Sequence, residues 1–191
     1  MGKGGAVATP DSRSGLIRPA VPGDADAIAA VHLGTWRDAY AGILPAAFLD
    51  AQRVDEFAKR WRGRLTDPAE RSFTLVYEQQ GQVRAFASGG LSRDGDGGGE
   101  VYAIYVDPAC QGRGAGARLL AAAARSLAGA GFTEAGLWAF AENHSARGFY
   151  EAQGWRHSGT PDAVKSGTFG GTRHTEVRYA RPLDNASGKA P

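Results

Sequence analysis

Three glycines within five residues, Gly112, Gly114 and Gly116, are the first feature of the sequence that can do chemistry. They follow an apolar stretch that ends at Val106, and they lead into a run whose leucines and alanines recur at helical spacing. Glycines let a ligand approach the backbone closely, and the free amides and partial positive charge of a helix N-terminus attract anions. The residues alone therefore predict a phosphate-binding turn at 111–116.

Details of the turn separate the ligands that it can hold. A nucleotide-binding P-loop needs Lys followed by Ser or Thr after its last glycine, whereas residues 116–118 are Gly-Ala-Arg. Dinucleotide binding stays open, because residues 112–117 meet the relaxed Rossmann spacing and Glu142 follows the next expected strand. Against it, Pro108 and Gln111 separate the glycines from the strand, and too little chain follows to complete a doubly wound domain. A plain tight turn without a ligand is the third possibility.

Hydrophobic periodicity and turn residues predict the elements that must position this turn. Residues 92–99 are rich in glycine and aspartate, so we expect a mobile loop there without a catalytic residue. The order of elements is a mixed α/β layout rather than a strict βαβ alternation. Strands are expected at 16–18, 73–77, 83–87, 100–106, 135–140, from 155 and at 176–179, and helices at 24–40, 46–64, 114–130 and 143–153.

Composition is that of one globular domain: 191 residues, 42% apolar and 22% charged. We expect a disordered segment at 1–14, a single domain at 15–182 and a disordered tail at 183–191. The net charge of +2 is too small to indicate a nucleic-acid partner, and no apolar run suits a signal peptide or a membrane span. A single cysteine, Cys110, excludes an intramolecular disulfide and a multi-cysteine metal site. We therefore expect a cytoplasmic monomer or homodimer that binds no metal, membrane or nucleic acid.

Two stretches of the chain resemble one enzyme family. Residues 106–116, Val-Asp-Pro-Ala-Cys-Gln-Gly-Arg-Gly-Ala-Gly, look like the Gln/Arg-x-x-Gly-x-Gly motif of the GNAT family of N-acetyltransferases. Residues 143–155 are similar to the family's helix that carries an asparagine, a Tyr-Glu pair and a Gly-aromatic ending. The resemblance covers roughly residues 16–182. It implies a mixed α+β fold with a mostly antiparallel sheet flanked by about four helices, and an enzyme that moves the acetyl group of acetyl-CoA to an amine.

This resemblance assigns the glycine turn to coenzyme A. Backbone amides from Gln111 through Ala117 would hold the pyrophosphate, and the strand 104–106 would pair with pantetheine and stabilise the thioester oxygen as it gains charge. Asn143 would contact the cofactor, although capping of the following helix explains an asparagine there equally well. The cofactor-binding residues implied are Ile104, Tyr105, Val106, Gln111, Gly112, Arg113, Gly114, Ala115, Gly116, Ala117 and Asn143.

In the mechanism that the resemblance implies, a neutral amine attacks the thioester, a tetrahedral oxyanion forms, and CoA leaves as a thiol. Tyr150 is the proposed proton donor, because a phenol with a pKa near ~10 stays protonated at neutral pH; an ordinary buried aromatic is the alternative. Glu100, at the start of the cofactor-binding strand, is the first candidate for the base that deprotonates the amine; a solvated residue at the end of the glycine-rich loop is the equal alternative. Glu78, Asp38, His32 or a chain of water molecules are weaker candidates.

Aromatic residues around the bend after the first helix are expected to cover the acceptor. Trp36 and Tyr40 lie one helical turn apart and are the predicted substrate-binding residues, while packing of the helix on the sheet accounts for at least half of the aromatic residues there. The expected acceptor is a small amine or a peptide N-terminus. Two other classes stay open: a module that senses acyl-CoA without catalysis, against which Tyr150 argues, and an NAD(P)-dependent Rossmann oxidoreductase.

Overall fold

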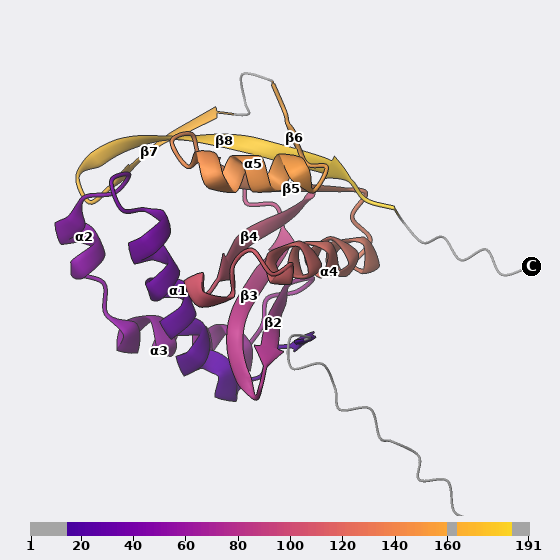
Figure 1. Ribbon diagram of the computed structural model, residues 1–191. Helices are drawn as coiled ribbons and strands as arrows, with labels where there is room; N and C mark the ends of the chain where they lie inside the picture. Colours follow the sequence, from indigo (N-terminus) through magenta and orange to yellow (C-terminus); the bar gives the residue numbers. More distant parts are fainter. Residues whose placement is uncertain (1–14, 160–163, 185–191) are drawn as a thin grey trace, which may run out of the picture.

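A single twisted sheet runs through the protein in a computed structural model that describes residues 15–159 and 164–184 (Figure 1). Residues 1–14 and 185–191, which the sequence predicts to be disordered, lie outside the described residues. Leu183 is described: its amide donates to the carbonyl of Thr133 at 2.9 Å. The elements are β1 (Leu16–Pro19), η1 (Pro22–Asp24), α1 (Ala25–Ala39), α2 (Ala46–Asp50), α3 (Val54–Thr66), β2 (Phe73–Gln79), β3 (Gln82–Leu91), β4 (Gly99–Val106), η2 (Pro108–Cys110), α4 (Ala115–Gly129), β5 (Glu134–Phe140), α5 (His144–Ala152), β6 (Arg156–His157), β7 (Val164–Phe169) and β8 (Thr172–Pro182).

The strand order is β1-β2-β3-β4-β5-β8-β6, and β7 pairs with β8 as well. Every pair of neighbours is antiparallel except β4 and β5, which are parallel. The predicted mixed α+β fold with a mostly antiparallel sheet is thus confirmed. A doubly wound parallel sheet, which the oxidoreductase alternative requires, is absent from the described part of the chain, so that alternative is wrong.

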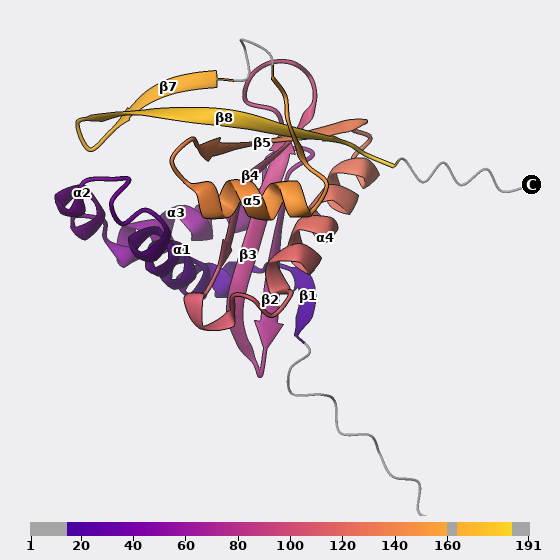
Figure 2. The same ribbon diagram turned by 45° about the horizontal axis from the view of Figure 1, so that its top comes forward.

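The parallel pair is very short. Residues 99–101 of β4 pair with residues 135–137 of β5, and beyond them the two strands diverge. In Figure 2 the strands β2, β3 and β4 lie close to vertical, whereas β5 and β8 lie close to horizontal. The sheet therefore consists of two antiparallel halves that are joined at one end of β4 and separate toward the other.

Helices cover both faces of the sheet. Because side chains alternate along each strand, each face of the sheet offers apolar side chains to the helices that cover it. On one face α1 and α3 bury Ile28 and Trp61 against Val76 and Phe86. On the other face α4 and α5 cover a larger core; in both views these two helices lie on the same side of the sheet. That core includes Leu75, Ala85, Ala87, Leu119, Leu120, Leu127, Leu137, Trp155 and Tyr179.

Two elements differ from the sequence prediction. The expected helix at 46–64 is two helices, because Leu49 of α2 packs with Leu44 and Phe140 whereas Phe57 of α3 packs into the core under α1. A single straight helix does not reach both clusters. The strand β7 was not predicted, since its alternate residues are exposed and it pairs only with β8.

Arg18 ties the first strand to the start of α1. Its guanidinium donates to both carboxylate oxygens of Asp24 at 2.7 and 2.9 Å, and to Glu78 on β2 at 2.7 and 2.9 Å. Asp24 also accepts the amide of Val21 at 2.8 Å. The hydrogen bonds from Arg18 hold the pKa of the Asp24 carboxyl below its usual value.

Replacing Asp24 with Ala removes these bonds, and we expect the free energy of unfolding at pH 7 to fall by about 1.5–3 kcal/mol. Because the folded-state pKa of Asp24 is lowered, its contribution is present above the unfolded-state pKa and is lost as pH falls through the folded-state pKa. Urea unfolding of both proteins at about pH 7 and pH 3 should show the difference shrinking in acid. Exposed Glu70→Ala is the control, and a pH-independent difference would contradict the assignment.

Candidate active site

The divergence of β4 from β5 leaves a strand edge without a partner strand. From Ala103 to Val106, β4 pairs with β3 on one side, and no described strand bonds to its other side. Two of the three predicted pantetheine-binding residues, Ile104 and Val106, pack toward the α4 core, while Tyr105 packs on the α1 face. The edge therefore offers backbone amides and carbonyls to a ligand lying between the two halves of the sheet.

The turn after β4 is braced by its own side chains. The Asp107 carboxylate accepts the amide of Ala109 at 3.0 Å and pairs with Arg84 on β3 at 3.0 Å. The carbonyl of Val106 accepts the Gln111 side-chain amide at 3.1 Å and the Thr35 hydroxyl at 3.2 Å. Gln111 thus has a structural contact that holds the start of the predicted phosphate turn against the end of the strand.

The glycines of this turn shape an open cradle. Gly112 and Gly114 have φ angles of +70° and +82°, and Gly114 is the left-handed N-cap of α4. A Cβ atom added to either would meet nothing within 4 Å, whereas one added to Gly116 would lie 3.4 Å from both Val106 and Phe149. Within the described residues, the amides of residues 112–117 donate no hydrogen bond to protein. Ala115 is buried, while the side chain of Arg113 is exposed.

Asn143 caps α5: its side-chain oxygen accepts the amide of Ala146 at 3.1 Å. The capping interpretation is therefore confirmed, and contact with a cofactor stays a prediction. Nearby, the Arg147 guanidinium donates to the Tyr179 hydroxyl and to the carbonyl of Ala141 at 3.0 and 2.9 Å. These contacts fix the N-terminal turn of α5 beside the divergence of the two strands.

Three tyrosines converge on the divergence from both faces of the sheet. The hydroxyls of Tyr40 and Tyr105 lie 3.2 Å apart. Tyr150, on α5, is buried and interacts electrostatically with both of them, and its hydroxyl forms no hydrogen bond with any residue that the structure describes. Burial raises the pKa of Tyr150 above its ordinary value, so the phenol stays protonated at neutral pH. Its role as proton donor stays a prediction.

The aromatic residues of α1 have packing partners as well as a position beside the site. The Trp36 ring makes edge contacts with Phe57 and Tyr40 at centroid distances of 5.7 and 5.8 Å. The Tyr40 ring meets Phe140 of β5 edge-on at 5.0 Å. Both Trp36 and Tyr40 are only partly buried, so each keeps a surface toward solvent, and acceptor binding by them stays a prediction.

Glu100, the first candidate for the base, is 2% exposed and bound by one arginine. Its carboxylate accepts the backbone amide of Arg93 at 2.9 Å and the Arg93 Nε at 3.1 Å, and Nη2 of the same residue donates a further bond. It lies at the paired end of β4, opposite Gly136 of β5. The amide and the guanidinium of Arg93 therefore occupy both oxygens of this carboxylate. The base role of Glu100 stays a prediction.

His32, a weaker candidate, is enclosed by aromatic rings. It stacks on Tyr105 at a centroid distance of 4.7 Å, meets Phe57 edge-on at 4.8 Å, and accepts the indole N–H of Trp61 at 3.2 Å. Burial lowers the pKa of His32 to about 3. The imidazole is therefore neutral at physiological pH and is a poor proton acceptor there.

One carboxylate at this site was not singled out from the sequence. Glu176 on β8 is half-buried and lies opposite Phe140 of β5 and Lys165 of β7. Burial raises its pKa above the ordinary value. A signal was present: Val177 and Tyr179 are core residues of the same strand, so alternation places the side chain of Glu176 on the other face.

A model of the "Acetyltransferase (GNAT) family" matches residues 34–155. YuaI of Bacillus subtilis, an uncharacterized N-acetyltransferase, is 33% identical over 170 residues, which cover 87% of this chain and 92% of that protein. The chain belongs to the GNAT family. PaiA N-acetyltransferase of Thermoplasma acidophilum, solved with coenzyme A, shares the fold at 19% identity and a TM-score of 0.67, covering 87% of this chain and 99% of that one. Ribosomal-protein-alanine N-acetyltransferase of Brucella melitensis does so at 22% identity and 0.68, covering 88% and 99%.

Membership in the GNAT family identifies the protein as an acetyl-CoA-dependent N-acetyltransferase, as the motif resemblance implied. The residues present fit this substrate. The amides of 112–117 have no acceptor among the residues that the structure describes, and the space above Gly112 and Gly114 is open, as a pyrophosphate at a helix N-terminus requires.

The described part of this GNAT protein contains neither a group of side chains suited to a metal ion nor a helix suited to cross a membrane. No group of three or more His, Cys, Asp or Glu side chains is placed there to hold a metal ion. None of its helices there combines the length and the apolar character needed to cross a membrane.

The loop between β3 and β4, expected to be mobile, is tied to the far half of the GNAT sheet. Asp94 accepts the indole N–H of Trp138 on β5 at 2.8 Å and forms an ion pair with Lys165 on β7. Asp96 forms an ion pair with Arg178 on β8 at 2.9 Å. The loop therefore spans the junction of the two halves and borders the α1 face of the site.

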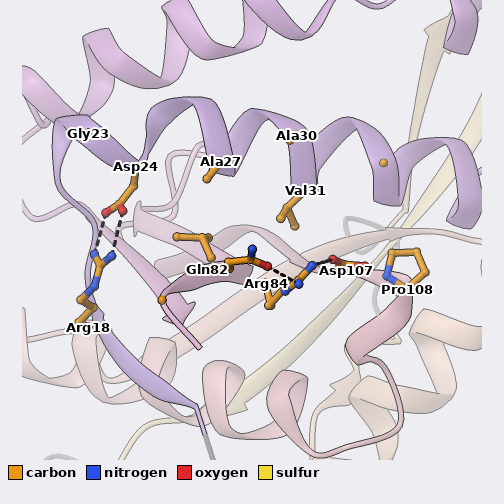
Figure 3. Close-up of a pocket in the computed structure, with 13 residues that line it drawn as sticks. Arg18, Gly23, Asp24, Ala27, Ala30, Val31, Gln82, Arg84, Asp107 and Pro108 are labelled. Atoms are coloured by element: carbon orange, nitrogen blue, oxygen red, sulfur yellow. Dashed lines mark hydrogen bonds and ion pairs between the residues drawn. The ribbon is translucent and has the colours of Figure 1, made fainter. Parts of the chain in front are cut away.

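A separate groove of about 640 Å³ lies between α1 and the turn that joins β2 to β3 (Figure 3). Its charged residues are paired with one another, Arg18 with Asp24 and Arg84 with Asp107. None of the predicted catalytic, cofactor-binding or acceptor-binding residues lines it. The groove is therefore distinct from the GNAT site.

Replacing Gly114 with Ala should weaken coenzyme A binding. A left-handed φ of +82° costs a residue with a Cβ atom about 1–2 kcal/mol, and relief of that strain turns the amides of the cradle. We expect the dissociation constant for CoA, measured by isothermal titration calorimetry, to rise about tenfold.

The matched control is Gly129→Ala at the other end of α4, where an added Cβ atom meets nothing and φ is not left-handed. This variant should bind CoA as the wild type does. Equal affinities for all three proteins would contradict the assignment of the cradle.

Proposed function

We propose that this protein transfers the acetyl group of acetyl-CoA directly to a primary amine of a small molecule or a peptide. The observation that carries the proposal is the meeting of three features at the divergence of β4 and β5. These are the unpaired edge of β4, the Tyr150 hydroxyl on the α5 side, and the Tyr40–Tyr105 hydroxyl pair on the α1 side. An amine entering from the α1 side would meet a thioester held along β4.

In this mechanism the protein's own groups bind acetyl-CoA, stabilise the developing negative charge and transfer a proton. Amides of residues 112–117 hold the pyrophosphate, and the edge of β4 pairs with pantetheine. A β4 amide donates to the thioester oxygen, which stabilises the tetrahedral intermediate as the amine attacks. Tyr150 then gives its proton to the departing sulfur, because burial keeps its phenol protonated.

The nature of the acceptor is supported by the chemistry of the α1 face. Trp36 and Tyr40 present partly exposed aromatic surface that suits an ammonium group or an apolar substituent. The name of the Brucella melitensis neighbour indicates an alanine of a ribosomal protein as its acceptor, which is consistent with a peptide N-terminus as one option here. A small primary amine fits the same surface.

A second candidate function is an acyl-CoA sensor without catalysis. One observation favours it: Glu100, the first candidate for the base, is bound by Arg93 through its backbone amide and its guanidinium. A sensor would retain the cradle and tight acetyl-CoA binding, yet it would show no turnover with any amine.

Replacing Tyr150 with Phe removes only the hydroxyl. We expect kcat for acetyl transfer to fall by about 10²-fold or more, the usual contribution of a positioned acid, while acetyl-CoA affinity changes less than about twofold. Release of CoA thiol, followed with a panel of primary amines and peptides, measures kcat, and calorimetry measures affinity.

The matched control is Tyr102→Phe, whose hydroxyl donates to the carbonyl of Leu91 away from the three-tyrosine cluster. Its kcat should stay near the wild-type value. Full turnover by Tyr150→Phe would rule out the donor role, and tight acetyl-CoA binding without turnover by the wild type would favour the sensor.

A further inference from the structure

We propose that Glu176 binds the ammonium group of the acceptor and takes its proton, and that it selects amines without a neighbouring carboxylate. The proposal rests on the function proposed above and names both a residue and a substrate class for it.

Strand register places Glu176 on the acceptor face. It lies directly opposite Phe140 on β5, and residues that face each other across an antiparallel pair point to the same side of the sheet. The ring of Phe140 contacts Tyr40 of the α1 segment at 5.0 Å, so that side is the α1 face. Glu176 and the predicted acceptor-binding residues therefore share one face.

Charges around Glu176 are already paired with other groups. Lys165, its neighbour on β7, forms an ion pair with Asp94 and lies 3.9 Å from the centre of the Trp138 ring. Arg93 forms an ion pair with Glu100. Glu176 itself forms no hydrogen bond or ion pair through its carboxylate with any residue in ranges 15–159 and 164–184. The Glu176 carboxylate can therefore form an ion pair with a cationic substrate.

Two tyrosines link Glu176 to the proposed proton donor. Its charge acts on both Tyr40 and Tyr105, and Tyr150 interacts with the same two residues. The 3.2 Å hydroxyl pair of Tyr40 and Tyr105 is thus within electrostatic range of both the carboxylate and the Tyr150 phenol. An amine bound at Glu176 would have its nitrogen on the side of the thioester from which attack must come.

The surroundings of Glu176 predict which amines bind. Aromatic rings of Tyr40, Tyr105 and Phe140 favour an ammonium group that carries an apolar or aromatic substituent. Glu100 and Asp94 are each paired with a cation, so Glu176 carries the negative charge that an incoming substrate meets on this face. A carboxylate next to the amine, as in a free amino acid, would meet like charge. Simple amines and peptide N-termini avoid that repulsion.

Protons balance in the proposed step. An alkylammonium with a pKa near ~10.4 arrives protonated and gives one proton to the Glu176 carboxylate. The neutral nitrogen forms the C–N bond, the C–S bond breaks, and the sulfur takes the Tyr150 proton. The second nitrogen proton then restores Tyr150 through water, and Glu176 releases its proton to solvent. The net products are the amide, CoA thiol and one proton.

The step requires ionised Glu176, so kcat/KM should rise with pH as this carboxyl ionises. Burial raises the pKa of Glu176, which shifts that rise toward neutral pH. The titratable and charged groups that act on Glu176 or share its face are Tyr40, Arg93, Asp94, Glu100, Tyr105, Lys165 and His174, together with Arg178 two residues further along β8 and its partner Asp96.

The test uses the full chain with phenethylamine as the acceptor and phenylalanine as its carboxylate-bearing counterpart. For wild type we expect kcat/KM for phenethylamine to exceed that for phenylalanine at least about tenfold, the effect of about 1.4 kcal/mol. Glu176→Gln should lower kcat/KM for phenethylamine about 10²-fold and remove the acid limb of its pH profile. Glu176→Gln should also reduce the ratio of kcat/KM for phenethylamine to that for phenylalanine. Glu176→Asp should keep the acid limb of the pH profile of kcat/KM.

Controls separate this role from a structural one. A carboxyl with a raised folded-state pKa contributes less to the stability of the folded protein as pH rises through that pKa. Replacing Glu176 with Gln should therefore not lower the melting temperature at pH 7.5. Its KM for acetyl-CoA should also be unchanged. Glu56→Gln, an exposed carboxylate on α3, should behave as wild type in every measurement. Wild-type activity and an unaltered acid limb in Glu176→Gln would overturn the proposal.

Failure of the proposed function gives a different result. If wild type turns over no amine, phenethylamine binding to the CoA-saturated protein is measured by NMR titration. Binding that is lost in Glu176→Gln and weaker for phenylalanine supports the acceptor-binding role, although the proton transfer would then be excluded. Equal binding by wild type and variant, or no binding by wild type, overturns the proposal.

Discussion

The separation of β4 from β5 after three paired residues is the constraint on which the rest of the site depends. Each strand satisfies its backbone elsewhere: β4 pairs with β3 along its length, and β5 pairs with β8 over residues 134–140. The sheet therefore does not need the missing part of the parallel ladder to hold together. Thr35 and Gln111, which both bond to the carbonyl of Val106, brace the far end of β4 where no β5 neighbour is available.

Leaving this edge and the glycine turn unpaired is tolerable because both face water or a ligand rather than the core. A buried amide without a partner costs about 1–3 kcal/mol, and several such amides would not survive inside either hydrophobic cluster. The two clusters, one under α4 and α5 and one under α1 and α3, supply the stability that the junction lacks. The cradle is thus formed before binding, which lowers the ordering cost when a ligand arrives.

Features encoded by neighbouring residues were predictable, and features that join distant residues were not. The glycine turn, the Asn143 cap and the strands β2 to β5 follow from spacing within about ten residues, and each is present. The contacts of the 92–98 loop join Asp94 to Lys165 across 71 positions and Asp96 to Arg178 across 82. No local pattern indicates such pairs. The same holds for Glu176, whose position beside Tyr40 follows from the register of β8 against β5.

Burial on the α1 face acts in opposite directions on the pKa values of two candidate proton acceptors, His32 and Glu176. Removing water disfavours a charged form, so it lowers the pKa of a histidine and raises that of a carboxyl. His32, enclosed by Tyr105, Phe57 and Trp61, becomes too weak a base, with a pKa of about 3. Glu176, only half enclosed and without an ion pair to any described residue, becomes a stronger base than a free carboxylate. The same apolar surface that suits an aromatic amine therefore favours the carboxylate, and not the imidazole, as the group that deprotonates it.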